Sequence, residues 1–283
     1  GTPEHPVPQD SADARHPWVS IPDPIHFVRL ALARGRALGR PHGLATGAAV
    51  REFLAHGRYC DWDSRSVRDT LPVIVDGAMA DIDVATRLFR FVRDHILYFF
   101  APWGTPASCT LSAKEGCCTN KSNLLVALLR AAGIPAAYGV LHVNPQEYFG
   151  NIGPPFLKPL VSSRSVHVYT MAFLQGRWVR CDPSTDRELS SKTAHFCRQT
   201  RLIEWDGLQD ALDFLQPQHV YSDRGMHPSV DELLDKPPRH GHPATLIILN
   251  DYIRFIREQP PFPSAEALIN AYWSRTTAAE GNA

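Results

Sequence analysis

The chain has 283 residues, of which 44% are hydrophobic and 20% are charged, and this balance is typical of a globular protein with one large or two small domains. Its 29 basic and 29 acidic residues cancel, which argues against a broad nucleic-acid or anionic-membrane surface. No apolar run reaches the roughly 18 residues that a bilayer-spanning helix needs, and no signal-like segment opens the chain. We therefore expect no nucleic-acid partner and no membrane partner.

The cysteines and histidines indicate neither a disulfide framework nor a metal site. Six cysteines are present, but the chain is much longer than the small secreted domains that disulfides stabilise. We expect six thiols in a reducing compartment, and hence a cytoplasmic protein. Histidines 219, 227, 240 and 242 have no C-x-x-C or H-E-x-x-H spacing beside them, so no metal is expected.

The N-terminal part predicts an arm followed by helices. Residues 1–24 are rich in Pro, Asp and His, which favours an extended arm. Apolar residues at helical spacing predict helices over 25–38, 48–56 and 83–95. Asp81 or Asp83 is the expected N-cap of the third helix.

The stretch 116–136 reads GCCTNKSNLLVALLRAAGIPA and predicts a central, buried helix from Cys118 to Ala132. Gly133 is its expected C′ residue, and Pro135 prevents continuation. A strand is predicted over 136–143. The long connection over 144–165 is then a candidate wall of a substrate cleft.

The second half predicts a hairpin and then helices. Strands over 166–174 and 177–181 are joined by a two-residue turn, Gln175–Gly176. Alternation places His167, Tyr169 and Met171 on one face of the first strand. Beyond about residue 200 the chain becomes helical again, with helices predicted over 243–259 and from Ser264, as N-cap, to Trp273.

This order of elements predicts an α+β fold, in which the helix that carries Cys118 packs on an antiparallel sheet and extra helices flank the core at both ends. The expected divisions are an arm over 1–24, a helical segment over 25–80, a catalytic core over 81–200 and a C-terminal helical segment over 201–283 that packs on the core. The flanking helices could alternatively form a separate lobe.

Cys118, His167 and Asp182 have the residue types and order of a nucleophile, a base and an orienting group. The N-terminus of a helix favours a thiolate, because unpaired N–H groups and a partial positive charge are concentrated there. A buried inert cysteine, a structural strand histidine and a turn-forming aspartate are the alternative readings of the same residues. Cys117 is interpreted as a packing residue, since a redox pair usually has C-x-x-C spacing.

Three blocks of this sequence resemble the transglutaminase-like superfamily of papain-like Cys-His-Asp enzymes, in its bacterial single-domain type. The family pattern is G-x-C with a helix ending L-L-R-A-x-G-I-P-A, then a strand histidine, then W-V-x-x-D-P-T. The register to Arg130 fits Cys118, and Trp178 and Asp182 fit the third block, where Ser184 is an additional residue before the threonine. The chain departs from the pattern at Tyr169, where tryptophan is usual, at Met171, where an acidic residue is usual, and in its cysteine doublet.

The resemblance implies a transglutaminase-like fold and cysteine-dependent acyl transfer without a cofactor or calcium. The thiolate of Cys118 would form a thioester acyl-enzyme from an amide or thioester donor, and an amine or water would accept the acyl group. The substrate would be a small molecule, a peptide or a carrier-bound acyl group. A peptidase or amidase with the same triad, and an inactive binding module, are the alternatives.

An oxyanion hole would also be required, and the backbone N–H of Cys118 is its natural first donor. Trp103, Asn120 and Tyr169 are the candidates for the second donor or for substrate binding.

Overall fold

The computed structural model describes residues 51–149, 152–212, 217–236 and 241–280, which belong to one compact unit, Leu38–Ala283. The arm predicted over 1–24, the helix over 25–38 and the start of the helix over 48–56 lie outside the described residues. The described end of that last helix is a 3₁₀ turn, η1 (Arg51–Leu54).

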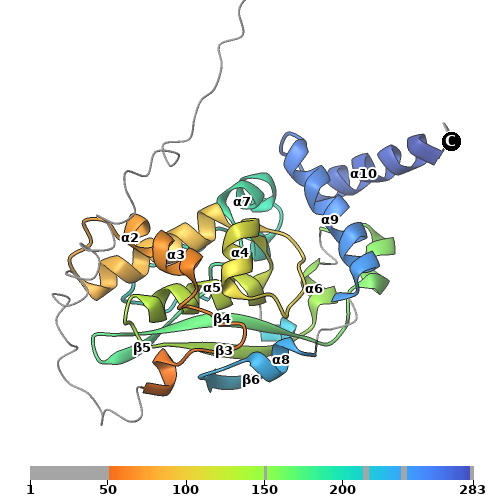
Figure 1. The fold of residues 1–283 in the computed structure, drawn as a ribbon. Helices are drawn as coiled ribbons and strands as arrows, with labels where there is room; N and C mark the ends of the chain where they lie inside the picture. Colours follow the sequence, from red (N-terminus) through yellow and green to blue (C-terminus); the bar gives the residue numbers. More distant parts are fainter. Residues whose placement is uncertain (1–50, 150–151, 213–216, 237–240, 281–283) are drawn as a thin grey trace, which may run out of the picture. The chain divides into compact units, whose positions relative to one another are not determined.

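A four-stranded antiparallel sheet forms the centre of the molecule, in the order β5-β4-β3-β6 (Figure 1). The strands are β3 (Ala136–Val143), β4 (Ser165–Leu174), β5 (Arg177–Cys181) and β6 (Val220–His227). The predicted hairpin between β4 and β5 is confirmed, and its two turn residues both have positive φ, as a type I′ turn requires. Strand β6 was not predicted, because it is a polar edge strand without an apolar alternation.

Helix α5 (Cys118–Ala131) packs on β4 and β3, and its far side is covered by α2 (Arg65–Ile74), α3 (Asp81–His95) and α4 (Ala107–Ala113). Twelve of its residues are buried, which confirms a central helix and the predicted α+β class. Gly133 follows it with φ of 81°, as expected of a C′ glycine.

The predicted N-cap of α3 was wrong by one or more residues. Ala80 is the N-cap and makes no side-chain cap, while Asp81 and Asp83 lie in the first turn. There the two carboxylates favour the helix through its dipole instead of through a capping hydrogen bond.

Two very short strands precede the helix that carries Cys118. β1 (Leu97–Tyr98) pairs in parallel with β2 (Glu115–Gly116), and the N–H of Phe99 continues the pairing to the carbonyl of Gly116 at 3.3 Å. Because Cys117 and Cys118 follow Gly116 directly, this pairing fixes the backbone from which α5 begins.

The connection over 144–165 contains α6 (Pro145–Phe149) and a 3₁₀ helix, η2 (Pro155–Leu160), where the sequence predicted only loop. The elements that follow the hairpin are α7 (Arg187–Thr193), η3 (Arg198–Thr200), η4 (Pro217–His219), α8 (Asp231–Leu234), α9 (Pro243–Glu258) and α10 (Ala265–Glu280). Ser264 caps α10 through the N–H of Ala267, as predicted, although the helix continues beyond Trp273.

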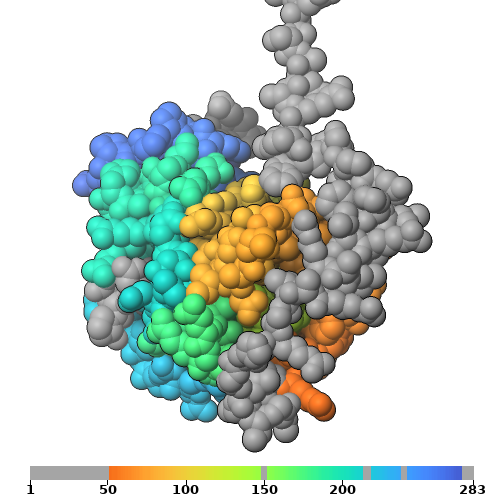
Figure 2. Space-filling model, turned by 90° about the vertical axis from the view of Figure 1, so that its left-hand side faces the viewer, coloured from red at the N-terminus to blue at the C-terminus, as the bar shows by residue number. Residues whose placement is uncertain are grey.

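Buried apolar residues form two clusters. The larger cluster lies between the sheet, α5 and α3, and the smaller one joins α9 and α10 to Phe99, Phe100, Leu157 and Val161. On the face in Figure 2, α2 and α3 (orange) lie beside α7 (teal) and the β4–β5 hairpin (green), in agreement with the contacts of α3 with α7 and β4. None of the helices that the structure describes is long and apolar enough to cross a membrane.

Candidate active site

Cys118 is the first residue of α5 and is half-buried, whereas Cys117 is the buried N-cap. The side chain of Asn120 closes a capping box, because its Oδ1 accepts from the backbone N–H of Cys117 at 3.1 Å and from the Cys117 thiol at 3.0 Å. Its Nδ2 donates to the carbonyl of Pro102 at 2.9 Å. Of the two adjacent thiols, Cys118 is therefore the accessible one and Cys117 is held in the cap.

The first turn of α5 lies against an open edge of β4. The backbone N–H of Val168 hydrogen bonds to the sulfur of Cys118, and its carbonyl accepts from the hydroxyl of Ser122 at 2.9 Å. In an antiparallel strand both groups of one residue point to the same edge. Cys118 is consequently held next to the residue that follows His167.

His167 and Asp182 are in direct contact. The Nε2 atom of His167 lies 2.5 Å from Oδ2 of Asp182, and both side chains are buried. The other carboxylate oxygen of Asp182 accepts from the backbone N–H of Ser184 at 2.8 Å, which fixes the carboxylate. Since Nε2 faces the carboxylate, Nδ1 is the ring nitrogen that would exchange a proton with a nucleophile. The structure thus brings Cys118, His167 and Asp182 to one place, at the end of β4.

The two thiols of the doublet titrate as a pair. A hydrogen bond from Cys118, together with the Thr119 hydroxyl and the N–H groups of Thr119 and Asn120, lowers the pKa of Cys117 to about 6 despite its burial. The same hydrogen bond, burial and the charge of Cys117 raise the pKa of Cys118 well above its ordinary value. The pair therefore loses one proton below the ordinary pKa of a thiol, and the second proton is retained.

The three candidates for the second oxyanion donor make different contacts. Asn120 is occupied by the cap, as described above. The ring of Tyr169 lies over Gly139 on β3, so closely that a Cβ there would overlap it, and its hydroxyl hydrogen bonds to Arg180. Trp103 is buried in the main core, one residue after the Pro102 carbonyl that Asn120 binds.

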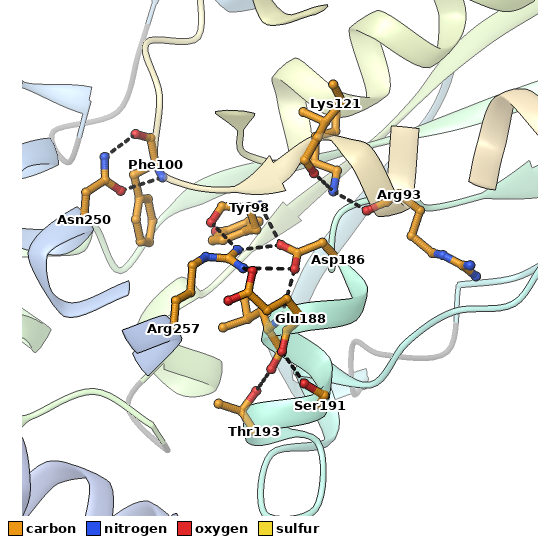
Figure 3. Close-up of polar contacts among 12 residues, drawn as sticks. Arg93, Tyr98, Phe100, Lys121, Asp186, Glu188, Ser191, Thr193, Asn250 and Arg257 are labelled. Carbon is orange, nitrogen blue, oxygen red and sulfur yellow. Dashed lines mark hydrogen bonds and ion pairs between the residues drawn. The ribbon is translucent and has the colours of Figure 1, made fainter. Parts of the chain in front are cut away.

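Lys121 is a buried cation that the sequence analysis did not identify as part of the site. Its Nζ donates to the carbonyls of Arg93 at 3.2 Å and Ile96 at 2.6 Å, which end α3 (Figure 3). It therefore ties the first turn of α5 to the C-terminus of α3. Burial lowers the pKa of Lys121 to about 7.

We expect Lys121 to make stability rise with pH. Its pKa is about 7 in the folded chain against 10.5 ordinarily, so the unfolded chain binds more protons between these values. From pH 7 to 9, the free energy of unfolding should rise by about 2 kcal/mol more in the wild type than in Lys121→Met. Urea unfolding of both proteins at each pH measures this difference. Equal pH slopes in the two proteins would contradict a buried, partly neutral lysine.

A second buried polar cluster joins α9 to the segment that leads to Cys117 (Figure 3). Arg257 pairs with Asp186 at 2.6 Å, and both contact Tyr98: the arginine donates to its carbonyl and the carboxylate accepts from its N–H. Asn250 binds both the N–H and the carbonyl of Phe100 at 2.8 Å. The sequence offered one signal for this cluster, since Asp186 is an aspartate at the N-cap of α7.

Among the residues that the structure describes, no group of three or more His, Cys, Asp and Glu side chains could hold a metal ion. His240, one of the histidines considered above, lies outside the described residues.

Comparisons with known proteins identify the family of this part of the chain. Residues 68–183 match the model of the transglutaminase-like superfamily. No curated protein matches the chain. A solved structure from Cytophaga hutchinsonii, named "Putative Cysteine Protease", is similar at a TM-score of 0.46 and 16% identity, over 70% of this chain and 53% of that chain. The chain therefore spans about half the length of that protein.

The match to the transglutaminase-like superfamily covers residues 68–183, which include Cys118, His167 and Asp182. The resemblance drawn from the three sequence blocks is thereby confirmed. The family and the mixed α and antiparallel β fold support a cysteine-dependent enzyme.

Proposed function

We propose that the protein is an acyltransferase that works through a thioester on Cys118, with His167 as the acid and base and Asp182 as the orienting group. The observation that carries the proposal is the contact at the end of β4. His167 is bound to Asp182 at 2.5 Å, and the next residue, Val168, binds the sulfur of Cys118. This arrangement suits a nucleophile next to an oriented imidazole.

In the proposed reaction, one thiol proton of the doublet passes to His167, the thiolate of Cys118 attacks the carbonyl carbon of an amide or thioester, and a C–S bond forms. The tetrahedral oxyanion would be bound by the backbone N–H of Cys118, with a second donor from Trp103 or Tyr169, because Asn120 is held in the cap of α5. The C–N or C–S bond to the leaving group then breaks, and His167 donates its proton to that group. An amine or water, deprotonated by His167, attacks the thioester and releases the thiolate.

The negative charge in this proposal forms when a proton of the cysteine doublet passes to His167, and either sulfur can carry it. Cys117 has a pKa of about 6, and the hydrogen bond between the two sulfurs allows the proton to pass from Cys118 to Cys117. The charge would then lie on the half-buried sulfur, which substrate can reach. We further propose that the acyl group is part of a small molecule, a peptide or a carrier-bound intermediate. A cytoplasmic location stays a prediction from the sequence.

The pH dependence of iodoacetamide labelling tests the nucleophile, with mass spectrometry to locate the label. We expect labelling of Cys118 to rise with a midpoint near pH 6, following the first proton of the pair. In His167→Ala labelling should be roughly tenfold slower or more at pH 6 to 7, because the ring that takes the thiol proton is lost. The exposed Cys109 is the internal control. Labelling of Cys118 no faster than that of Cys109 would favour an inactive binding module.

Hydroxylamine distinguishes transfer from hydrolysis once an acyl donor is found. An acyltransferase should form the hydroxamate in preference to the free acid at millimolar hydroxylamine. Release of the free acid alone would favour the peptidase or amidase alternative, which uses the same three residues.

A further inference from the structure

We infer that an apolar pocket between α9 and the 152–161 segment is an acyl-binding site that takes the aliphatic chain of the acyl donor. The inference rests on the proposed function, because it gives the acyl group of that reaction a chemical class. The apolar side chains that line the pocket come from three parts of the chain: Phe100, Ile152, Leu157, Val161, Leu249 and Ile253.

The interior of the pocket suits a hydrocarbon. Lys158 alone of its lining residues, all of which the structure describes, carries a charge, and that residue is exposed. The polar groups of Gln146 and Tyr252, which also line the pocket, are used by the walls: the amide of Gln146 donates to Val161 at 2.7 Å, and the hydroxyl of Tyr252 donates to Ile152. A polar ligand would therefore find few partners inside, whereas an alkyl chain would lose only its contact with water.

The walls are fixed before any ligand binds. Asn250 on α9 holds the backbone of Phe100 through two hydrogen bonds of 2.8 Å. Gln146 bridges to the carbonyls of Lys158 and Val161, and Tyr252 ties α9 to Ile152. A cavity held by hydrogen bonds from outside, with apolar side chains facing inward, is a preorganised site that costs little entropy to fill.

The pocket lies at the same end of the sheet as the candidate nucleophile. Its wall segment connects β3 to β4, and Val143 pairs with Ser165 only two residues from the pair of Leu141 with His167. Its other wall, Phe100, follows the residue whose N–H binds Gly116, directly before the doublet. Figure 1 shows α6 and α9 on the side toward which the N-terminal end of α5 points. A donor whose carbonyl is at Cys118 could therefore extend its chain toward this pocket.

Alkylation of Cys118 by a series of N-alkyl iodoacetamides, from methyl to octyl, tests the pocket without requiring acyl transfer. The thiolate displaces iodide from each reagent, and mass spectrometry locates the label. Each methylene that leaves water should raise the apparent second-order rate about fourfold. We expect the hexyl reagent to exceed the methyl reagent roughly 30-fold or more at Cys118, which corresponds to burial of about half of the added chain. At the exposed Cys109 the rate should not depend on chain length.

Two variants assign the effect to the pocket. Leu249→Phe fills it and should reduce the advantage of the hexyl reagent to less than about threefold. The control is Leu246→Phe, on the same helix and in the same apolar cluster but outside the lining. If Leu249→Phe does not fold, Val161→Ala serves as the test. This variant enlarges the pocket, so the alkyl chain that labels Cys118 fastest should be longer than in the wild type.

Absence of a chain-length preference at Cys118 in the wild type would overturn the inference, and so would a preference that both pocket variants leave unchanged. The two proposals can be contradicted separately. If labelling of Cys118 follows the ordinary pKa of a thiol but still depends on chain length, the proposed function is contradicted and the pocket is not. If labelling has its midpoint near pH 6 but does not depend on chain length, the pocket is contradicted and the proposed function is not.

Discussion

Replacing Cys118 with alanine is expected to lower the acyl-transfer rate at least about 10³-fold while the protein remains folded. Cys118 is half-buried, so the loss of its sulfur costs the fold little, yet the reaction loses the atom that forms the thioester. The measurement is the burst of leaving group from an activated ester or thioester, together with the thermal unfolding midpoint.

Cys117→Ala is the matched comparison, one residue away. It should retain most of the activity and lose about 1 kcal/mol of stability, because the N-cap of α5 is removed. It should also lower the pKa of Cys118, since the hydrogen bond and charge of Cys117 are what chiefly raise it. The opposite pattern, with Cys117→Ala inactive and Cys118→Ala active, would mean that the nucleophile is the other sulfur of the doublet.

Arg257→Ala is expected to destabilise the protein by about 3 to 5 kcal/mol, the largest effect on stability that we foresee. The side chains of Arg257 and Asp186 are only 8% and 1% exposed, so the truncation leaves a buried carboxylate without its cation. Burial alone would raise the pKa of Asp186. The hydrogen bond from Arg257 and the positive charge of that residue lower the pKa instead. The thermal midpoint should fall by about 10 °C for a domain of this size.

Arg254→Ala is the control for this variant. Arg254 lies one turn away on α9 and is exposed. Its guanidinium carbon lies 5.6 Å from the centre of the Phe99 ring, and that of Arg257 lies 5.0 Å from the same ring. We expect Arg254→Ala to change stability by less than about 0.5 kcal/mol.

The lowered pKa of Asp186 stabilises the wild type above the unfolded value of 3.8, and this contribution is lost as the pH falls below it. The difference in the free energy of unfolding between the wild type and Arg257→Ala should therefore decrease below about pH 4. A difference that does not change with pH would contradict the ion pair as its source.

The sequence predicted the elements that have a strong local signal. The helix that begins at Cys118, the strand over 136–143 and the hairpin joined by Gln175–Gly176 all have the predicted bounds to within one residue. Each combines a clear apolar period with a glycine or proline at its end. These are also the elements that carry Cys118, His167 and Asp182, so the order of the candidate site residues could be anticipated from the chain.

What could not be predicted depends on contacts between distant segments. Asp186 and Arg257 are 71 residues apart, and Lys121 reaches carbonyls 25 and 28 residues before it. No local pattern reports such pairs. Strand β6 is held by its pairing with β3, although its own residues are exposed. The pocket likewise arises only when α9 meets the connection that follows β3.

The place where β5 ends has a consequence for the Asp-Pro pair at residues 182 and 183. In the register that pairs Thr170 with Cys181, continuation of the hairpin would bring Pro183 opposite Val168. Proline has no N–H, so it cannot extend the ladder there. The backbone groups of Val168 stay open to Cys118 and Ser122. Pro183 therefore leaves this edge of β4 unpaired, and the first turn of α5 binds there instead. A residue with an N–H at position 183 could pair with Val168 and would compete with Cys118 for the same strand edge.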